Sequence, residues 1–183
     1  MTVTHALRAT HDAILVGIGT VLADDPQLTV RLVAGAHPQP VVLDSHLRFP
    51  LQARLLQHPC GVWIATTSAA DAAPAPGNAE LIQVATGADG KVDLADLLRR
   101  LAARGIRSVM VEGGATVIAT FLRQRLVDYV ALTVSPRYIG GLNGLAGAPV
   151  KDSGALPRLH EVGYTPAGDD LIVWGEPVWE RRA

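Results

Sequence analysis

Residues 17–31 read GIGTVLADDPQLTVR, and the rest of the chain is organised around this stretch. It follows the apolar run Ala13–Val16, whose length and β-branched content predict a buried strand that delivers a polar loop to one sheet edge. The two glycines let a ligand approach the backbone, while Thr20, Asp24 and Arg31 offer a hydroxyl, a carboxylate and a guanidinium. Such a loop suits a sugar-phosphate ligand. The alternative is a plain strand–loop–strand connection with a solvated acidic turn.

Apolar patterning predicts the remaining elements. The clearest helix is residues 93–104, where Asp93 can cap the start, leucines recur on one face and Gly105 ends it in a left-handed conformation. Residues 159–165 and 170–174, separated by Pro-Ala-Gly-Asp, predict an antiparallel hairpin. Further helices are expected at 2–10, 51–56 and 115–126, strands at 28–32, 40–44, 61–66, 80–84, 106–111 and 128–134, and irregular segments at 140–144 and 146–154.

Strands that alternate with helices imply right-handed crossovers and a mostly parallel sheet. We therefore predict an α/β fold, a three-layer sandwich with a mostly parallel central sheet and a C-terminal antiparallel hairpin. At 183 residues the chain is expected to form one domain over 1–183.

Composition excludes several classes of function. The chain is 49% hydrophobic and 18% charged with a net charge of −1, which predicts a globular protein without a polybasic surface for nucleic acid or anionic membranes. No long apolar span or export signal is seen, so we expect a soluble, cytoplasmic protein. The single cysteine, Cys60, lies in an apolar run and is expected to be a buried structural thiol. The six histidines show no metal-ligand spacing, and no metal is predicted.

A second candidate site is Val111-Glu112-Gly113-Gly114-Ala115-Thr116, a strand end that passes through two glycines into a helix. A helix N-terminus presents unpaired N–H groups and partial positive charge, which suit the pyrophosphate of a dinucleotide. The segment is not the Gly-x-Gly-x-x-Gly fingerprint. The alternative is a tight strand–helix turn that uses glycine only structurally.

Taken together, these motifs closely resemble the signature of the riboflavin-biosynthesis pyrimidine reductases, the reductase half of the bifunctional deaminase-reductase, which has a dihydrofolate-reductase-like fold. The resemblance covers nearly the whole chain. It is carried by residues 7–31, 41–45, 111–116, 128–130 and 170–173.

The resemblance implies particular roles for residues that match the family's motifs. It implies that the substrate, a pyrimidine ribose-phosphate, meets Arg8, Leu28, Arg31 and Glu112. It implies that NADPH is held by Thr20, Asp24, Ser45 and Gly114-Ala115-Thr116-Val117-Ile118-Ala119-Thr120. Guanidinium groups at Arg8 and Arg31 suit the ribose phosphate, and the Glu112 carboxylate suits the exocyclic nitrogens of the pyrimidine. For either arginine alone, the alternative is an ordinary surface arginine.

The implied reaction reduces the ribosylamino side chain of the substrate to a ribitylamino one, with hydride passing from the nicotinamide to the sugar's C1. No acid or base is assigned; Asp24 and Glu112 are the nearest candidates for handling protons. The resemblance also implies a homodimer. The alternatives are a reductase of the same fold that acts on another substrate and a nucleotide-binding protein without catalysis.

The chain departs from the family at its start. Family members normally begin with a strand inside the sheet that also lines the site, whereas this sequence starts after that segment and carries no deaminase half. We therefore expect this 183-residue chain alone to be a poor catalyst, and an upstream strand to restore activity.

Overall fold

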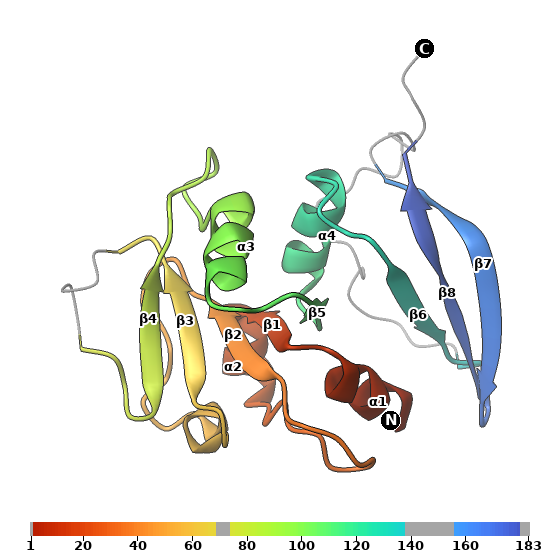
Figure 1. Ribbon diagram of the computed structural model, residues 1–183, viewed down its shortest axis with the longest axis horizontal. Coiled ribbons are helices and arrows are strands. Elements are labelled where there is room, and N and C mark those ends of the chain that lie inside the picture. Colours follow the sequence, from red (N-terminus) through yellow and green to blue (C-terminus); the bar gives the residue numbers. More distant parts are fainter. Residues whose placement is uncertain (1, 69–73, 138–155, 180–183) are drawn as a thin grey trace. The chain divides into compact units, whose positions relative to one another are not determined.

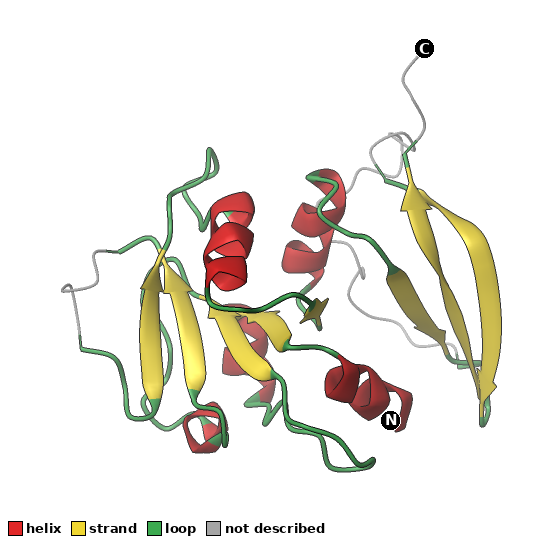
Figure 2. Cartoon of the chain, viewed as in Figure 1, coloured by secondary structure: helices red, strands yellow, loops and turns green. Residues whose placement is uncertain are grey.

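The computed structural model describes residues 2–68, 74–137 and 156–179. They form two compact units, Met1–Gly114 and Ala115–Ala183 (Figures 1 and 2). The segments expected to be irregular at 140–144 and 146–154 lie outside the described residues. A single folding domain over 1–183 stays a prediction.

A five-stranded parallel sheet forms the centre of the first unit, in the order β4-β3-β2-β1-β5. The predicted parallel sheet is confirmed. Its strands are β1 Ala13–Gly17, β2 Gln39–Leu43, β3 Val62–Thr66, β4 Ala79–Gln83 and β5 Val109–Val111. The helices of this unit are α1 Thr2–Thr10, α2 Ile18–Asp24, the short 3₁₀ helix η1 Arg54–Gln57, and α3 Leu94–Ala103.

One face of this sheet packs against α2 and the segment that leads into η1. Strand register places Val16 beside Val42, and Val42 beside Ile64, so the three side chains share a face. They join one core cluster with Ile18 and Val21 of α2. Because Ile18 and Val21 are three residues apart, a helical turn brings both onto the buried side.

The opposite face is covered by α3. Leu97 and Leu101 of this helix are fully buried. The Arg104 guanidinium at its end lies 5.1 Å from the centre of the Trp63 ring and pairs with Glu80 at 2.7 Å. Trp63 and Glu80 are register partners on the side of the sheet away from Ile64. Helices therefore cover both faces, which confirms the predicted three-layer arrangement for this unit.

The caps predicted for α3 are present. The Asp93 carboxylate accepts the backbone N–H of Asp96 at 2.8 Å, which satisfies one of the free donors at the helix start. Gly105 follows the helix with φ +89°, the left-handed conformation that glycine adopts without strain.

The second unit holds α4 Ala115–Arg123 and an antiparallel sheet in the order β6-β8-β7. β7 spans Arg158–Ala167 and β8 spans Asp170–Val178, and Gly168 turns between them with φ +67°, so the predicted hairpin is confirmed. β6, Val130–Val134, pairs antiparallel with β8. The strand that follows α4 therefore belongs to the hairpin's sheet.

Two predicted elements of the first unit are wrong. Residues 18–24 were expected to be loop but form α2, because burial of Ile18 and Val21 against the sheet outweighs the helix-weakening glycine at position 19. Residues 28–32 were expected to be extended but form no strand. Side chains, and not a neighbouring strand, bind the backbone of this segment: the Thr29 carbonyl accepts from Arg8, and the Val30 N–H donates to His37. Leu28 has φ +52°, which is not an extended conformation.

Other boundaries shift, and the environment of the thiol differs from expectation. The helix expected at 51–56 is a turn followed by η1, and the strand expected at 106–111 is paired only over β5.

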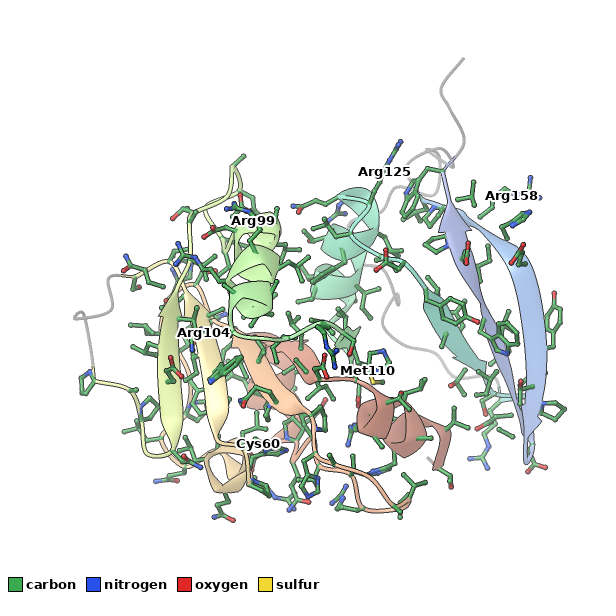
Figure 3. All side chains as sticks on the ribbon, viewed as in Figure 1. Cys60, Arg99, Arg104, Met110, Arg125 and Arg158 are labelled. Carbon is green, nitrogen blue, oxygen red and sulfur yellow. The ribbon has the colours of Figure 1, made fainter. Side chains whose placement is uncertain are left out.

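Cys60 is exposed, whereas the sequence predicted a buried thiol (Figure 3). The turn at 58–61 places the thiol before β3 begins, so the apolar run that follows does not bury it.

We expect Leu97→Ala to lower the free energy of unfolding by about 2–5 kcal/mol, because it removes fully buried methyl groups and leaves a cavity under α3. Urea unfolding measures the loss. The control is Leu51→Ala, since Leu51 is 78% exposed and its loss should change stability by less than about 0.5 kcal/mol. Equal effects of the two changes would contradict the packing of α3 on the sheet.

Candidate active site

The order of strands marks where a ligand would bind in the first unit. From β1 the chain adds β2, β3 and β4 on one side, and then places β5 on the other side of β1. In open α/β sheets, ligands bind outside the carboxyl ends of the strands at such a reversal. The segments that leave β1 and β5 there are Gly17–Thr20 and Glu112–Gly114. Both segments contain residues that the sequence analysis predicts to bind a ligand.

At the end of β5, the Glu112 carboxylate is held by Arg8 of α1. Arg8 Nε donates to Oε2 at 2.8 Å, and Nη2 donates to Oε1 at 2.5 Å. Arg8 Nη1 donates to the Thr29 carbonyl at 3.0 Å. The arginine is buried, while the glutamate side chain keeps 28% exposure. A two-pronged, charge-assisted pair fixes the carboxylate and leaves some of its lone pairs free to accept from a ligand.

This pairing engages three of the five N–H donors of Arg8, because Nε, Nη1 and Nη2 each donate once within the protein. Arg8 therefore positions Glu112 and is tied to Thr29. Its two other N–H donors remain for a ligand, and the substrate roles of Arg8 and Glu112 stay predictions.

His5 connects α1 to Arg31. His5 Nδ1 accepts the backbone N–H of Arg31 at 3.0 Å. Burial, followed by the nearby Arg8 and Arg31 guanidinium groups, lowers the pKa of His5, so the ring is neutral at pH 7. The Arg31 side chain is exposed and donates to the Gln27 side-chain carbonyl. Among the described residues it forms no ion pair, which leaves its charge for a ligand.

Gly113 and Gly114 shape the turn after β5. Their φ angles are +81° and +83°, a conformation that side chains with a Cβ rarely adopt. A Cβ at Gly113 would lie 3.6 Å from the Thr20 hydroxyl oxygen, so the start of α2 and the turn after β5 are in close contact. Thr20 therefore lies beside Gly113 at the strand reversal, and its cofactor role stays a prediction.

The exit of β2 carries a buried carboxylate that the site prediction missed. Asp44 is 0% exposed, and neither of its oxygens is hydrogen bonded within the described part of the chain. Arg48 Nε lies 4.0 Å from Oδ1, which is an ion pair but too long for a hydrogen bond. A buried, unsatisfied acceptor is costly, so this position favours a hydrogen-bond donor from outside the protein.

The neighbouring Ser45, predicted to bind the cofactor, is partly engaged. Its hydroxyl oxygen accepts the Val92 backbone N–H at 3.1 Å, and its carbonyl accepts the Thr67 hydroxyl at 2.9 Å. The hydroxyl hydrogen remains available to a ligand, because a serine oxygen both donates and accepts.

Two other predicted residues of the first unit lie outside these contacts. Asp24 ends α2 and is exposed, whereas Leu28 is buried in the core cluster against the sheet. Gly114 closes the first unit, and Ala115–Thr120 lie in α4 of the second, where Thr120 Oγ1 donates to the Thr116 carbonyl at 2.8 Å. Their cofactor role stays a prediction.

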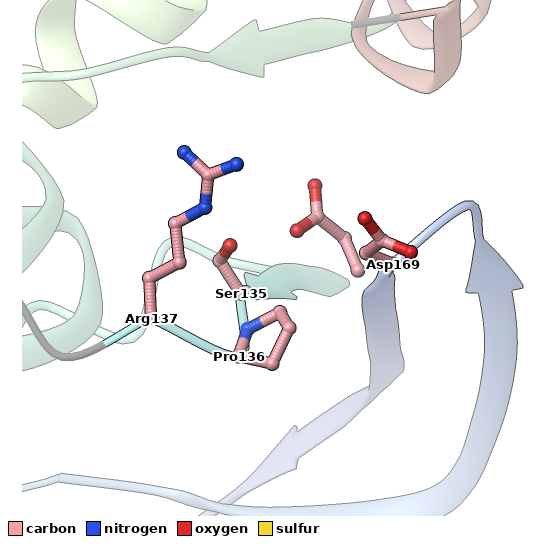
Figure 4. Close-up of a pocket in the computed structure, with 5 residues that line it drawn as sticks. Ser135, Pro136, Arg137 and Asp169 are labelled. Atoms are coloured by element: carbon pink, nitrogen blue, oxygen red, sulfur yellow. The ribbon is translucent and has the colours of Figure 1, made fainter.

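A cavity of about 680 Å³ in the second unit contains none of the predicted residues. It is lined by Ser135, Pro136, Arg137, Asp169 and Asp170 (Figure 4). It lies at the end of β6 and at the turn between β7 and β8. One guanidinium and two carboxylates face the same open space.

Comparison with known proteins identifies the family. Residues 1–173 match the model of the RibD C-terminal domain. The chain belongs to this family. The family recognised from the sequence motifs is thereby confirmed.

Two archaeal relatives are named 2,5-diamino-6-ribosylamino-4(3H)-pyrimidinone 5′-phosphate reductase. The protein from Archaeoglobus fulgidus is 41% identical over 145 residues, 74% of this chain and 66% of that relative. The protein from Methanothermobacter thermautotrophicus is 38% identical over 178 residues, 92% of this chain and 81% of that relative.

Solved structures agree on the fold. The riboflavin biosynthesis reductase Rib7 of Saccharomyces cerevisiae matches with a TM-score of 0.81 and 26% identity, over 97% of this chain and 80% of that one. The deaminase/5-amino-6-(5-phosphoribosylamino)uracil reductase of Thermotoga maritima matches with a TM-score of 0.77 and 31% identity, over 95% of this chain and 47% of that one. The predicted dihydrofolate-reductase-like fold of the family is confirmed.

No helix in the described part of the chain is long and apolar enough to span a membrane.

We expect Gly113→Ala to destabilise the protein by about 1–2 kcal/mol, because an alanine in the left-handed conformation is strained. Thermal and urea unfolding measure the change. Gly19→Ala is the matched control: it lies in α2, a Cβ there meets nothing within 4 Å, and alanine favours helices over glycine. Unchanged stability in Gly113→Ala would show that the turn is not constrained.

Proposed function

We propose that the chain catalyses the NADPH-dependent reduction of the ribosylamino side chain of a pyrimidine ribose-phosphate, a step of riboflavin biosynthesis. The reductases among its relatives support the reaction class. The observation that carries the proposal is the Glu112 carboxylate, held by Arg8 at the point where the strand order reverses.

Glu112 suits recognition of the pyrimidine. A carboxylate accepts two parallel hydrogen bonds from a ring that carries amino groups, and Arg8 keeps it oriented. Because Arg8 is buried and tied to Thr29, it restricts where the carboxylate points. Arg31 is proposed to bind the phosphate, since its charge is exposed and has no carboxylate partner in the described residues.

The fit of the nicotinamide cofactor rests on this chain's own groups at the carboxyl edge. Gly113 and Gly114 have no side chains and leave space for a ligand beside the backbone. The hydroxyl groups of Thr20 and Ser45 can donate hydrogen bonds, and the Asp44 carboxylate, which has no hydrogen-bond partner among the described residues, can accept them. When bound, the reduced nicotinamide would supply the hydride, and the protein would supply placement and charge. The proposed cofactor residues remain Thr20, Asp24, Ser45 and Gly114–Thr120. Asp24 is exposed at the end of α2.

The proposal includes a cytoplasmic homodimer. Exposed apolar side chains on the three-stranded sheet support a second copy as partner: Leu132 and Val134 of β6 and Tyr164 of β7 are each more than half exposed. Such a row of apolar side chains is typical of a protein–protein contact.

We expect the protein to oxidise NADPH in the presence of the pyrimidine ribose-phosphate, and to bind NADPH more tightly than NADH. The Ser45 hydroxyl and the exposed Arg48 guanidinium at the exit of β2 suit a 2′-phosphate, which NADH lacks. Fluorescence titration measures both affinities, and loss of NADPH absorbance measures turnover. Equal affinity for the two cofactors would remove the basis for this preference.

We expect Arg31→Ala to lower kcat/KM for the substrate by about ten- to a hundredfold, because a charge-assisted hydrogen bond contributes about 1.5–3 kcal/mol. NADPH affinity should stay close to that of the unchanged protein. The control is Arg107→Ala, an exposed arginine whose Nε lies 3.9 Å from its partner Asp12. An Arg31 variant that loses NADPH affinity but keeps its substrate KM would reverse the assignment.

A further inference from the structure

A polar cavity in the first unit, of about 410 Å³, is lined by cationic and amide side chains. Arg31 faces it from one side, His37 from the approach to β2, and Arg54, Gln57 and His58 from η1 and the residue after it. None of the residues that line it is acidic. A cavity with this lining attracts an anion.

Backbone hydrogen bonds fix which nitrogen of each histidine carries the proton. His37 Nδ1 accepts the Val30 N–H at 3.0 Å, and His58 Nδ1 accepts the Cys60 N–H at 3.2 Å. A nitrogen that accepts is unprotonated, so in both rings the N–H donor is Nε2. Both rings are therefore N–H donors at Nε2, and neither offers a free lone pair to a metal ion.

His58 Nε2 is an unsatisfied donor. The residue is 2% exposed, and Nε2 has no hydrogen-bond partner among the described residues. Burial, and then the nearby His37, lower the pKa of His58 to about 4, so it is a neutral donor at pH 7. A buried N–H without an acceptor is rare in proteins, and an oxyanion in the cavity would satisfy it.

Arg31 and Arg54 supply the charge. Neither guanidinium forms an ion pair with a carboxylate in the described part of the chain, and the Arg31 side chain donates only to the neutral amide of Gln27. The backbone of Arg54 is fixed, because its N–H donates to Asp25 Oδ1 at 2.8 Å. That carboxylate does not line the cavity. Two guanidinium groups and the N–H donors of the histidines are groups with which proteins hold phosphate.

We propose that this cavity binds a phosphate-class dianion, with Arg54 and the Nε2–H of His58 as ligand-binding groups in addition to Arg31. The anion is either free inorganic phosphate or the phosphate of a larger molecule. Thr29 lines the cavity and also accepts from Arg8, so the cavity adjoins the Arg8–Glu112 pair. A phosphate on the proposed substrate is therefore one of the two sources, and only that part of the inference rests on the proposed function.

The first experiment uses inorganic phosphate alone, without cofactor or substrate. Nitrogen-15 spectra of the histidine rings are recorded while phosphate is added at constant ionic strength, with chloride as the control anion. We expect the Nε2 signals of His58 and His37 to shift saturably with phosphate and not with chloride. Shifts that are linear, or equal for both anions, would overturn the proposal.

Two variants assign the contacts. Arg54→Gln keeps the backbone bond to Asp25 and removes the charge, and we expect phosphate affinity to fall about tenfold or more. Arg107→Gln, the exposed control, should leave the affinity unchanged. Saturable binding that is equal in the unchanged protein and in Arg54→Gln would show that phosphate binds elsewhere and would refute the site. Should Arg54→Gln fold poorly, His58→Gln, which replaces Nε2–H by a shorter amide donor, tests the other proposed contact of the same site and should also weaken binding.

A third experiment separates the sources of the anion. KM of the unchanged protein and of Arg54→Gln is measured for the phosphorylated pyrimidine and for its dephosphorylated form. A rise in KM for the phosphorylated form alone assigns the cavity to the substrate's phosphate. An unchanged KM, together with saturable binding of inorganic phosphate, assigns it to a separate anion. Because the first two experiments need no turnover, a protein without reductase activity can still confirm or refute the anion site.

Discussion

The complete burial of β1 is the constraint on which the first unit depends. Residues 13–16 have no exposed surface, and the strand pairs with β2 on one side and β5 on the other. A strand buried on both faces needs cover above and below, which α2 and α3 supply. The same position makes β1 the point where the strand order reverses, so the start of α2 and the turn after β5 meet there. One apolar run of four residues thus places both Thr20 and Glu112.

Some buried polar groups of the first unit have hydrogen-bond partners and others do not. Arg8 and Glu112 satisfy each other, although 104 residues separate them in the sequence. By contrast, the Asp44 carboxylate and the Nε2–H of His58 are buried without hydrogen-bond partners among the described residues. Each unsatisfied group costs folding free energy, which a ligand of the opposite character would recover. The acceptor lies at the carboxyl edge of β2 and the donor lies just before β3, so two different ligand groups are indicated.

The second unit is built on an antiparallel sheet. Its hairpin joins two long strands, and pairing with β6 gives the three strands that an antiparallel sheet needs to be stable. Several large apolar side chains on these strands remain exposed, among them Leu132 and Tyr164. One face of an antiparallel sheet can be exposed to solvent, but an exposed face rich in leucine, valine and tyrosine is typical of a surface that contacts another protein.

The sequence by itself determined the elements whose pattern is local. The periodic leucines and caps of α3, the apolar run of β1 and the turn between β7 and β8 were each predicted and confirmed, because spacing and turn chemistry act within a few residues. The motifs also determined the family. Only the tertiary structure decided that residues 18–24 are a helix and residues 28–32 are not a strand. It alone paired Arg8 with Glu112, left Cys60 exposed and gathered Arg31, Arg54 and His58 around one cavity. These outcomes depend on what packs against each segment from distant parts of the chain, and no local pattern carries that information.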